Sequence, residues 1–138
     1  MMQMKEMTVS AELDNLMAIT DFVDECLTEM NCPRRKLAQI NVVIDEVFCN
    51  IASYAYGKEK GTVNVRVDVE EKPKAILITF VDGGKPFDPL SKNNPDVTLP
   101  TMLRPIGGLG IYITKKTMDD VSYAYKDGQN VLTIRKRI

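Results

Sequence analysis

Residues 40–51 read INVVIDEVFCNI, and this stretch joins the apolar face of a helix to two polar side chains that can carry chemistry. From residue 37 to residue 51, apolar side chains recur at three- and four-residue spacing, which predicts an amphipathic helix. Pro33 suits the first turn of this helix, and Gly57 suits its end. We therefore expect a helix with one apolar face from Pro33 to about Tyr56.

The polar pair in this stretch is Glu46 and Asn50, which are four residues apart and so project from one side of the helix. An Asn side-chain oxygen is a neutral, hard ligand that suits Mg²⁺ when phosphates and waters supply the other oxygens. A carboxylate beside it can accept a proton from an attacking hydroxyl or water. Taken alone, the pair also fits an ordinary solvated helix face.

The flanking segments predict the rest of the fold. Alternating valines indicate a half-buried strand over residues 62–70, and residues 75–81 form its antiparallel neighbour across a short polar link. Before the central helix, we expect a short strand over residues 3–9 and an amphipathic helix that begins after Ser10 as its N-cap.

A third helix over residues 109–119 and two strands over residues 121–126 and 130–137 complete the chain. This order predicts an α/β two-layer sandwich, with a mixed, mostly antiparallel sheet and helices on one face. The length of 138 residues fits a single domain over residues 1–138.

A second chemical element, Asp82-Gly83-Gly84-Lys85-Pro86-Phe87-Asp88, directly follows an apolar strand. The Asp82 carboxylate at a strand end can accept a hydrogen bond from an exocyclic amine such as that of adenine. Gly84 permits a close backbone approach or a positive φ. An ordinary Asp-Gly turn is the alternative interpretation of this element.

A third element, Gly107-Gly108-Leu109-Gly110-Ile111, opens a helix. Helix N-termini present unpaired N–H groups, and glycines let phosphate oxygens approach them. The element matches neither the Walker nor the dinucleotide fingerprint, so a glycine hinge is the alternative. Residues 83–108 hold five of the seven prolines and show no periodicity, which is typical of a functional loop or a disordered segment.

Composition narrows the function classes. The chain has no histidine, which excludes Ser-His-Asp and Cys-His catalysis and imidazole metal sites. With 18 basic and 19 acidic residues, its net charge of −1 gives no electrostatic case for direct binding to nucleic acid or anionic membrane. No apolar stretch approaches membrane-spanning length, so we expect a cytoplasmic protein.

Together, the three elements resemble those of the GHKL or Bergerat-fold superfamily, which includes gyrase-type ATPases and histidine kinases. Within it, the chain is most similar to the anti-sigma-factor serine-protein kinases. Glu46 to Asn50 resembles the N box of that subfamily, Asp82 to Phe87 its first glycine box, and Gly108-Leu109-Gly110 its second. Thr133 on the last strand also fits the resemblance, which covers nearly the whole chain.

The resemblance implies a Bergerat ATP-binding fold whose cofactors are ATP and Mg²⁺. Asp82 would then recognise adenine, with Thr133 acting through water, while Asn50 holds Mg²⁺ and Glu46 serves as the catalytic base. The remaining nucleotide-binding residues would be Gly84, Phe87, Gly108, Leu109, Gly110 and Ile111, and the loop of residues 83–108 would close as a lid.

The same resemblance implies a homodimer that binds a sigma factor and phosphorylates a STAS-type anti-anti-sigma protein. The short opening strand could be a sheet edge that pairs with a second copy, or it could be covered within the monomer. Two other functions stay open: a non-catalytic ATP-binding regulatory module, and an ATPase with another client. The intact Glu46 counts against the first alternative, because a pure binding module does not need that carboxylate.

Overall fold

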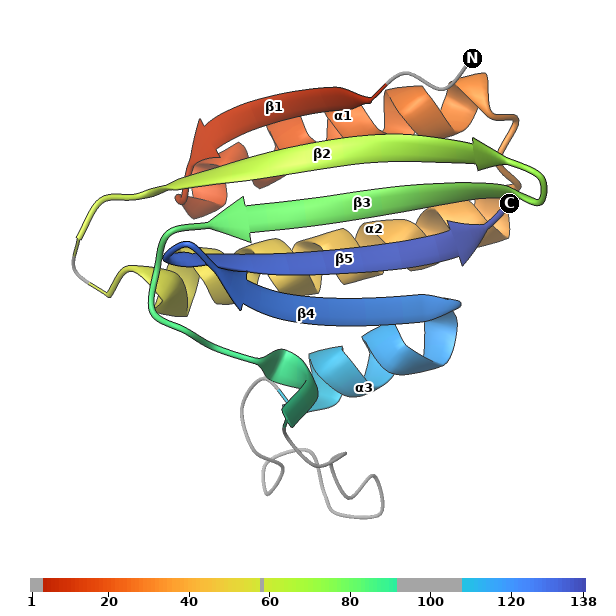
Figure 1. Cartoon of the computed structure of the whole chain (residues 1–138). Coiled ribbons are helices and arrows are strands. Elements are labelled where there is room, and N and C mark those ends of the chain that lie inside the picture. Colours follow the sequence, from red (N-terminus) through yellow and green to blue (C-terminus); the bar gives the residue numbers. More distant parts are fainter. Residues whose placement is uncertain (1–3, 58, 92–107) are drawn as a thin grey trace.

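The computed structural model describes residues 4–57, 59–91 and 108–138 (Figure 1). In chain order, the helices and strands are β1 (Lys5–Ser10), α1 (Leu16–Glu29), α2 (Arg34–Asn50), β2 (Thr62–Glu71), β3 (Lys74–Asp82), α3 (Gly108–Thr117), β4 (Asp120–Lys126) and β5 (Gln129–Arg137). Short 3-10 turns precede α1 and follow β3, and a π-helical turn, Ile51–Ala55, directly continues α2.

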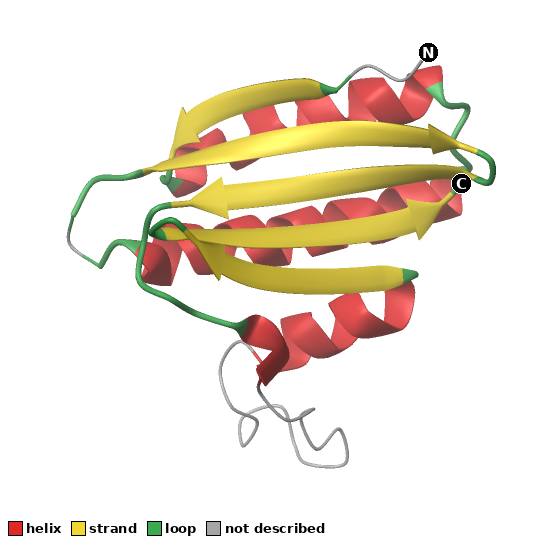
Figure 2. Ribbon diagram, viewed as in Figure 1, coloured by secondary structure: helices red, strands yellow, loops and turns green. Residues whose placement is uncertain are grey.

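The strands form one sheet in the order β1-β2-β3-β5-β4, and each neighbouring pair is antiparallel. Helices α1 and α2 lie together across one face of this sheet, and α3 packs beside α2 near the β4 edge (Figures 1 and 2). The two-layer α/β sandwich predicted from the sequence is therefore confirmed. Its sheet is antiparallel at every pairing of the described strands.

The core fills the space between the helices and the sheet because each strand alternates between its two faces. On β2, Val63, Val65 and Val67 point toward the helices and are buried. The register places Ile78 of β3 beside Val67 and Ile134 of β5, which extends the apolar surface across the sheet. The helices cover it with residues that are likewise fully buried: Ile19, Val23 and Leu27 from α1, and Ile40, Val43, Ile44 and Phe48 from α2.

The first helix begins later than the sequence predicts. Ser10 is the last residue of β1, where it pairs with Thr62 instead of capping a helix. The Asn15 side chain donates to the Ser10 carbonyl oxygen across 2.9 Å and to its hydroxyl across 2.7 Å, and α1 starts only at Leu16. Ser10 is therefore used for strand pairing, although a serine before a helix also suits the N-cap position.

The register of the central strands also sets the position of the functional residues. Asp82 of β3 pairs with Asn130 of β5 and with Val63 of β2. It therefore shares the inward face of Phe80 and Ile78, at the end of the sheet where the π-helical turn follows α2. Two polar side chains consequently meet on a face that is otherwise apolar.

Candidate functional site

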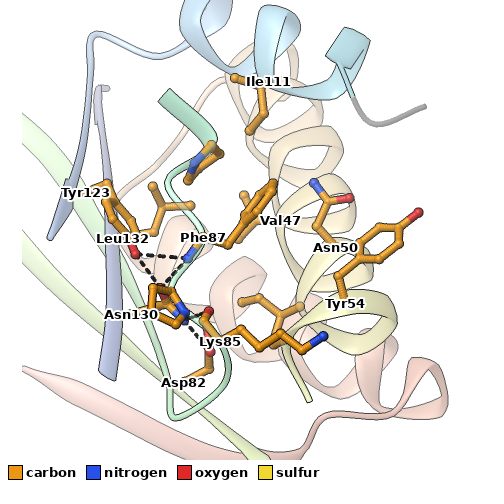
Figure 3. A pocket seen from close by; sticks show the side chains of 14 residues that line it. Val47, Asn50, Tyr54, Asp82, Lys85, Phe87, Ile111, Tyr123, Asn130 and Leu132 are labelled. Carbon is orange, nitrogen blue, oxygen red and sulfur yellow. Dashed lines mark hydrogen bonds between the residues drawn. The ribbon is translucent and has the colours of Figure 1, made fainter. Parts of the chain in front are cut away.

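A pocket of about 460 Å³ lies between the C-terminal part of α2, the segment after β3, α3, and strands β4 and β5 (Figure 3). Most of its lining is apolar, including Val47, Ile51, Ile111 and Leu132. The Phe87 ring, which is 41% exposed, also lines it. An apolar pocket with a few fixed polar groups suits a flat aromatic ligand with a small number of hydrogen-bonding positions.

The buried carboxylate of this pocket is Asp82, which is only 5% exposed. Its Oδ1 accepts two hydrogen bonds, from the Gly84 backbone N–H across 2.9 Å and from Nδ2 of Asn130 across 3.0 Å. Within the described part of the chain, Oδ2 accepts none. One oxygen of Asp82 is thus committed to the protein, and the other is available to a ligand in the pocket.

Among the described residues that line the pocket, Asn130 is the one whose side chain makes the most hydrogen bonds (Figure 3). Its Nδ2 donates to Asp82 and, across 2.7 Å, to the Lys85 carbonyl oxygen. Its Oδ1 accepts from the Phe87 backbone N–H across 3.1 Å and from the Tyr123 hydroxyl. The Phe87 N–H also points to the Tyr123 oxygen, at 3.2 Å. These bonds join the segment after β3 to strands β4 and β5.

Neither Asn130 nor Tyr123 is among the site residues predicted from the sequence. A signal was nevertheless available, because Asn130 alternates with Leu132 and Ile134, whose side chains are buried on the helix-facing side of the sheet. A lone amide in that alternating series is a buried polar group, and such a group requires hydrogen-bond partners. Three of these partners, Asp82, Lys85 and Phe87, lie in a distant part of the chain, so only the fold identifies them.

The Glu46–Asn50 pair stands on α2 as its spacing predicts. Asn50 lines the pocket, and its Nδ2 donates to Oε1 of Glu46 across 3.3 Å. The side-chain oxygen of Asn50 takes no part in this bond to Glu46. The Glu46 carboxylate is half-buried one turn earlier on the same helix.

Burial raises the pKa of the Glu46 carboxyl above its ordinary value. The hydrogen bond from Asn50 opposes this shift, and the neighbouring negative charge of Asp45 adds to it. A carboxylate whose pKa is raised is a better proton acceptor than a solvated one, which is the direction that general-base catalysis needs.

The π-helical turn forms one wall of the pocket and is bonded to the segment after β3. The Lys85 backbone N–H donates to the Ala55 carbonyl oxygen across 2.8 Å. The Tyr56 hydroxyl accepts from the Gly83 N–H across 2.7 Å and donates to the Thr62 carbonyl oxygen across 2.6 Å. A Cβ at Gly84 would overlap the Ala55 backbone, so a glycine is required there by close packing of this protein against itself.

The second glycine element lies at the start of α3. Gly108 to Gly110 form the first residues of this helix, and Ile111 reaches the pocket. The predicted lid over residues 83–108 is described only as far as residue 91, and residues 92–107 lie outside the described part of the chain. Its described portion bears Phe87 and Pro89, which line the pocket.

Thr133 requires a correction, because the structure does not bring it to Asp82. Thr133 pairs with Thr79 on the sheet face that points away from the helices, and their hydroxyl oxygens lie 3.1 Å apart. Successive strand residues point to opposite faces, so Leu132 faces the pocket and Thr133 cannot. Asn130, three residues earlier, is the β5 side chain beside Asp82.

The described residues hold no cluster of three or more acidic or thiol side chains that could by itself bind a metal ion. None of their helices has the length and apolarity that a membrane-spanning helix needs.

A one-sided α/β sandwich with a pocket at the end of its central strands is the architecture of a nucleotide-binding ATPase domain. The family model of the histidine kinase-like ATPase domain matches residues 9–136, and the chain belongs to this family. The family predicted from the N box and the two glycine boxes is thus confirmed.

Among curated proteins, the chain is similar to serine-protein kinases named RsbW. It is 26% identical to RsbW of Bacillus cereus (strain AH820) over 131 residues, which cover 92% of this chain and 81% of that protein. It shows the same identity and coverage with RsbW of Bacillus anthracis (strain CDC 684 / NRRL 3495). These relatives are named as kinases, and their name agrees with the subfamily that the sequence resembles.

Among solved structures, the chain is similar to the crystal structure of the RsbU and RsbW domains of a Mycobacterium tuberculosis protein. The TM-score is 0.69 at 14% sequence identity, and the match covers 98% of this chain. It covers 32% of that longer chain, so the likeness concerns one part of it. At this identity, the comparison supports the fold.

Proposed function

We propose that this chain is an ATP- and Mg²⁺-dependent serine-protein kinase that acts as an anti-sigma factor and phosphorylates a STAS-type anti-anti-sigma protein. One observation carries the proposal: Asn50, whose side chain is hydrogen-bonded to Glu46, and the half-committed carboxylate of Asp82 line the same apolar pocket. The kinase names of its relatives support the reaction class.

The residues at the Asp82 end fit adenine. Oδ2 of this buried carboxylate has no hydrogen bond within the described residues, and an exocyclic amine would supply its donor. Apolar side chains such as Leu132 and Val47 line the space around it and suit the faces of a purine ring. Guanine carries a carbonyl where adenine carries this amine, so the carboxylate would repel it.

The residues at the Asn50 end fit magnesium and phosphate. The Asn50 carbonyl oxygen is a neutral hard ligand, and the phosphate oxygens of ATP would supply the remaining charge. Backbone N–H groups at Gly108 to Ile111, in the first turn of α3, are donors suited to phosphate oxygens. Bound Mg²⁺ would neutralise the charge that develops on the transferred phosphoryl group.

Glu46 is the candidate catalytic base. Its burial raises its pKa, and Asn50 orients one of its oxygens. Its role would be to accept the proton of a serine hydroxyl while that oxygen attacks the terminal phosphate in line. Since phosphoryl transfer depends mainly on positioning and charge neutralisation, one base and one metal ligand from the protein suffice.

The partner assignment extends the resemblance to RsbW. The expected partners are a sigma factor and a STAS-type protein that bears the target serine, in a cytoplasmic homodimer without direct contacts to nucleic acid or membrane. Strand β1 is an edge of the described sheet, so its outer backbone groups are positioned to pair with a second copy.

A two-stage experiment tests the proposal. First, calorimetry with Mg²⁺ should show binding of ATP in clear preference to GTP. Second, single-turnover assays should show transfer of the terminal phosphate to serine of a purified STAS-type protein from the same organism. Glu46→Gln should retain ATP binding and lower the transfer rate by about 10²–10⁴-fold.

The outcomes separate the alternatives. ATP binding without transfer to any STAS-type protein and without hydrolysis would indicate a non-catalytic regulatory module. Release of inorganic phosphate with no acceptor would indicate an ATPase with another client. A protein that binds neither nucleotide would overturn the proposal.

A further inference from the structure

The side-chain amide of Asn130 has all of its hydrogen-bonding capacity used by the protein. Its two N–H donors face Oδ1 of Asp82 and the Lys85 carbonyl oxygen, and its oxygen accepts from Phe87 and Tyr123. The residue is 6% exposed. Because an amide has two donors and two acceptor lone pairs, Asn130 cannot bond a ligand without breaking an internal bond.

This saturation has a consequence for Asp82. The Asn130 donor and the Gly84 N–H both hold Oδ1, at 3.0 and 2.9 Å, so the carboxylate plane is fixed with Oδ2 as its remaining acceptor. Asp82 and Asn130 are also register partners on adjacent strands, which makes their separation a property of the sheet. The orientation of Asp82 is therefore decided by Asn130. The Asn130 amide itself has no free donor or acceptor that it could offer to a ligand.

The same amide also holds the backbone that follows Asp82. The Lys85 carbonyl and the Phe87 N–H, two residues apart, bond to opposite ends of the Asn130 side chain. The Tyr123 hydroxyl from β4 bonds to the Asn130 oxygen and shares the Phe87 N–H. One side chain thus sets both the carboxylate orientation and the path of the pocket wall that carries Phe87.

We infer that Asn130 is a positioning residue that sets adenine selectivity by orienting Asp82, with Tyr123 holding the Asn130 amide in place. The inference rests on the proposed function, since it assumes that Oδ2 of Asp82 receives the adenine amine. Asn130 acts through Asp82 and through the segment after it, and contributes no hydrogen bond of its own to the base.

The test compares two nucleotides that differ by that amine alone: ATP and purine riboside triphosphate, which lacks the 6-amino group. Calorimetry gives the affinity ratio of the two for each protein, and a loss of folded protein cancels in the ratio. The wild type should prefer ATP by about tenfold or more, the size of one hydrogen bond to a charged group.

Asn130→Ala removes the donor to Asp82 and should lower this ratio by at least about fivefold. Tyr123→Phe, which keeps the ring and should fold, should lower it by a smaller factor of about twofold. Thr133→Val serves as the control, because Thr133 lies on the opposite face of the sheet, and its ratio should equal that of the wild type.

The outcomes distinguish the positioning role of Asn130 from the assignment of adenine to Asp82. If the Asn130 and Tyr123 variants keep the wild-type ratio, even with weaker binding of both nucleotides, Asn130 has a structural role only and the inference is overturned. If the wild type itself binds both nucleotides equally, the assignment of adenine to Asp82 fails, and the inference fails with it.

Discussion

The backbone N–H of Lys85 donates to the carbonyl oxygen of Ala55 across 2.8 Å and thereby ties the segment after β3 to the π-helical turn after α2. The two backbones approach so closely that the intervening Gly84 has no room for a side chain. The glycine at position 84 is thus explained, in this chain, by contact between two walls of the pocket.

Gly84→Ala should destabilise the protein because its Cβ would overlap the Ala55 backbone, which cannot rotate away as a flexible side chain could. We expect a loss of about 1–3 kcal/mol in the free energy of unfolding, the usual cost of overpacking. Urea denaturation measures it. The matched control is Gly83→Ala, whose Cβ would meet only the Tyr56 hydroxyl at 3.7 Å. Equal stability of the two variants would contradict the packing argument.

Asp82→Asn should weaken ATP binding while preserving the fold. It replaces a carboxylate oxygen with an amide group at the position we assign to the adenine amine, and should cost roughly tenfold or more in affinity. Thr133→Val should leave the affinity unchanged, because Thr133 bonds to Thr79 on the far face of the sheet. Calorimetry on both variants checks this pair of expectations. Weaker binding by Thr133→Val alone would reverse the assignment.

Asn50→Ala should reduce the dependence of ATP binding on magnesium, since it removes the proposed oxygen ligand. In the wild type, ATP affinity should rise when Mg²⁺ is added to metal-free protein, and in this variant the rise should be much smaller. Asn50→Asp keeps an oxygen ligand and should retain the magnesium dependence. If Asn50→Ala responds to Mg²⁺ as the wild type does, the metal is held elsewhere.

Glu46→Gln should change the pH dependence of stability. Burial raises the folded-state pKa of Glu46, so its contribution to stability is fully present below the unfolded-state pKa and is lost as pH rises through the folded-state pKa. The variant has no such group, so it should gain stability relative to the wild type as pH rises from about 4 toward neutrality.

Denaturation of Glu46→Gln and the wild type at a series of pH values tests this expectation. The two stability curves should lie a constant distance apart at acid pH and diverge above it. Asp45→Asn is a useful comparison, because it removes the neighbouring negative charge that adds to the Glu46 pKa shift and should make the pH-dependent change smaller without abolishing it. A constant difference between Glu46→Gln and the wild type across the whole range would show that the Glu46 pKa is not raised.

The sequence by itself determined the order of the helices and strands and the spacing of the Glu46–Asn50 pair. Spacing along α2 places Glu46 and Asn50 one turn apart whatever surrounds the helix, and the structure joins them by a hydrogen bond. Alternation likewise predicted the strands, because a half-buried strand needs apolar residues at every second position. Such features depend on residues close together in the chain.

Only the tertiary structure decided which side chains lie beside Asp82. Asp82 and Asn130 are 48 positions apart in the sequence, and no local pattern predicts their contact, which follows from the pairing of β3 with β5. Strand register placed Thr133 on the far face and Asn130 in the pocket, although the resemblance favoured Thr133. The physical reason is the two-residue period of a strand: a shift of one position moves a side chain to the other face, and only the sheet fixes that register.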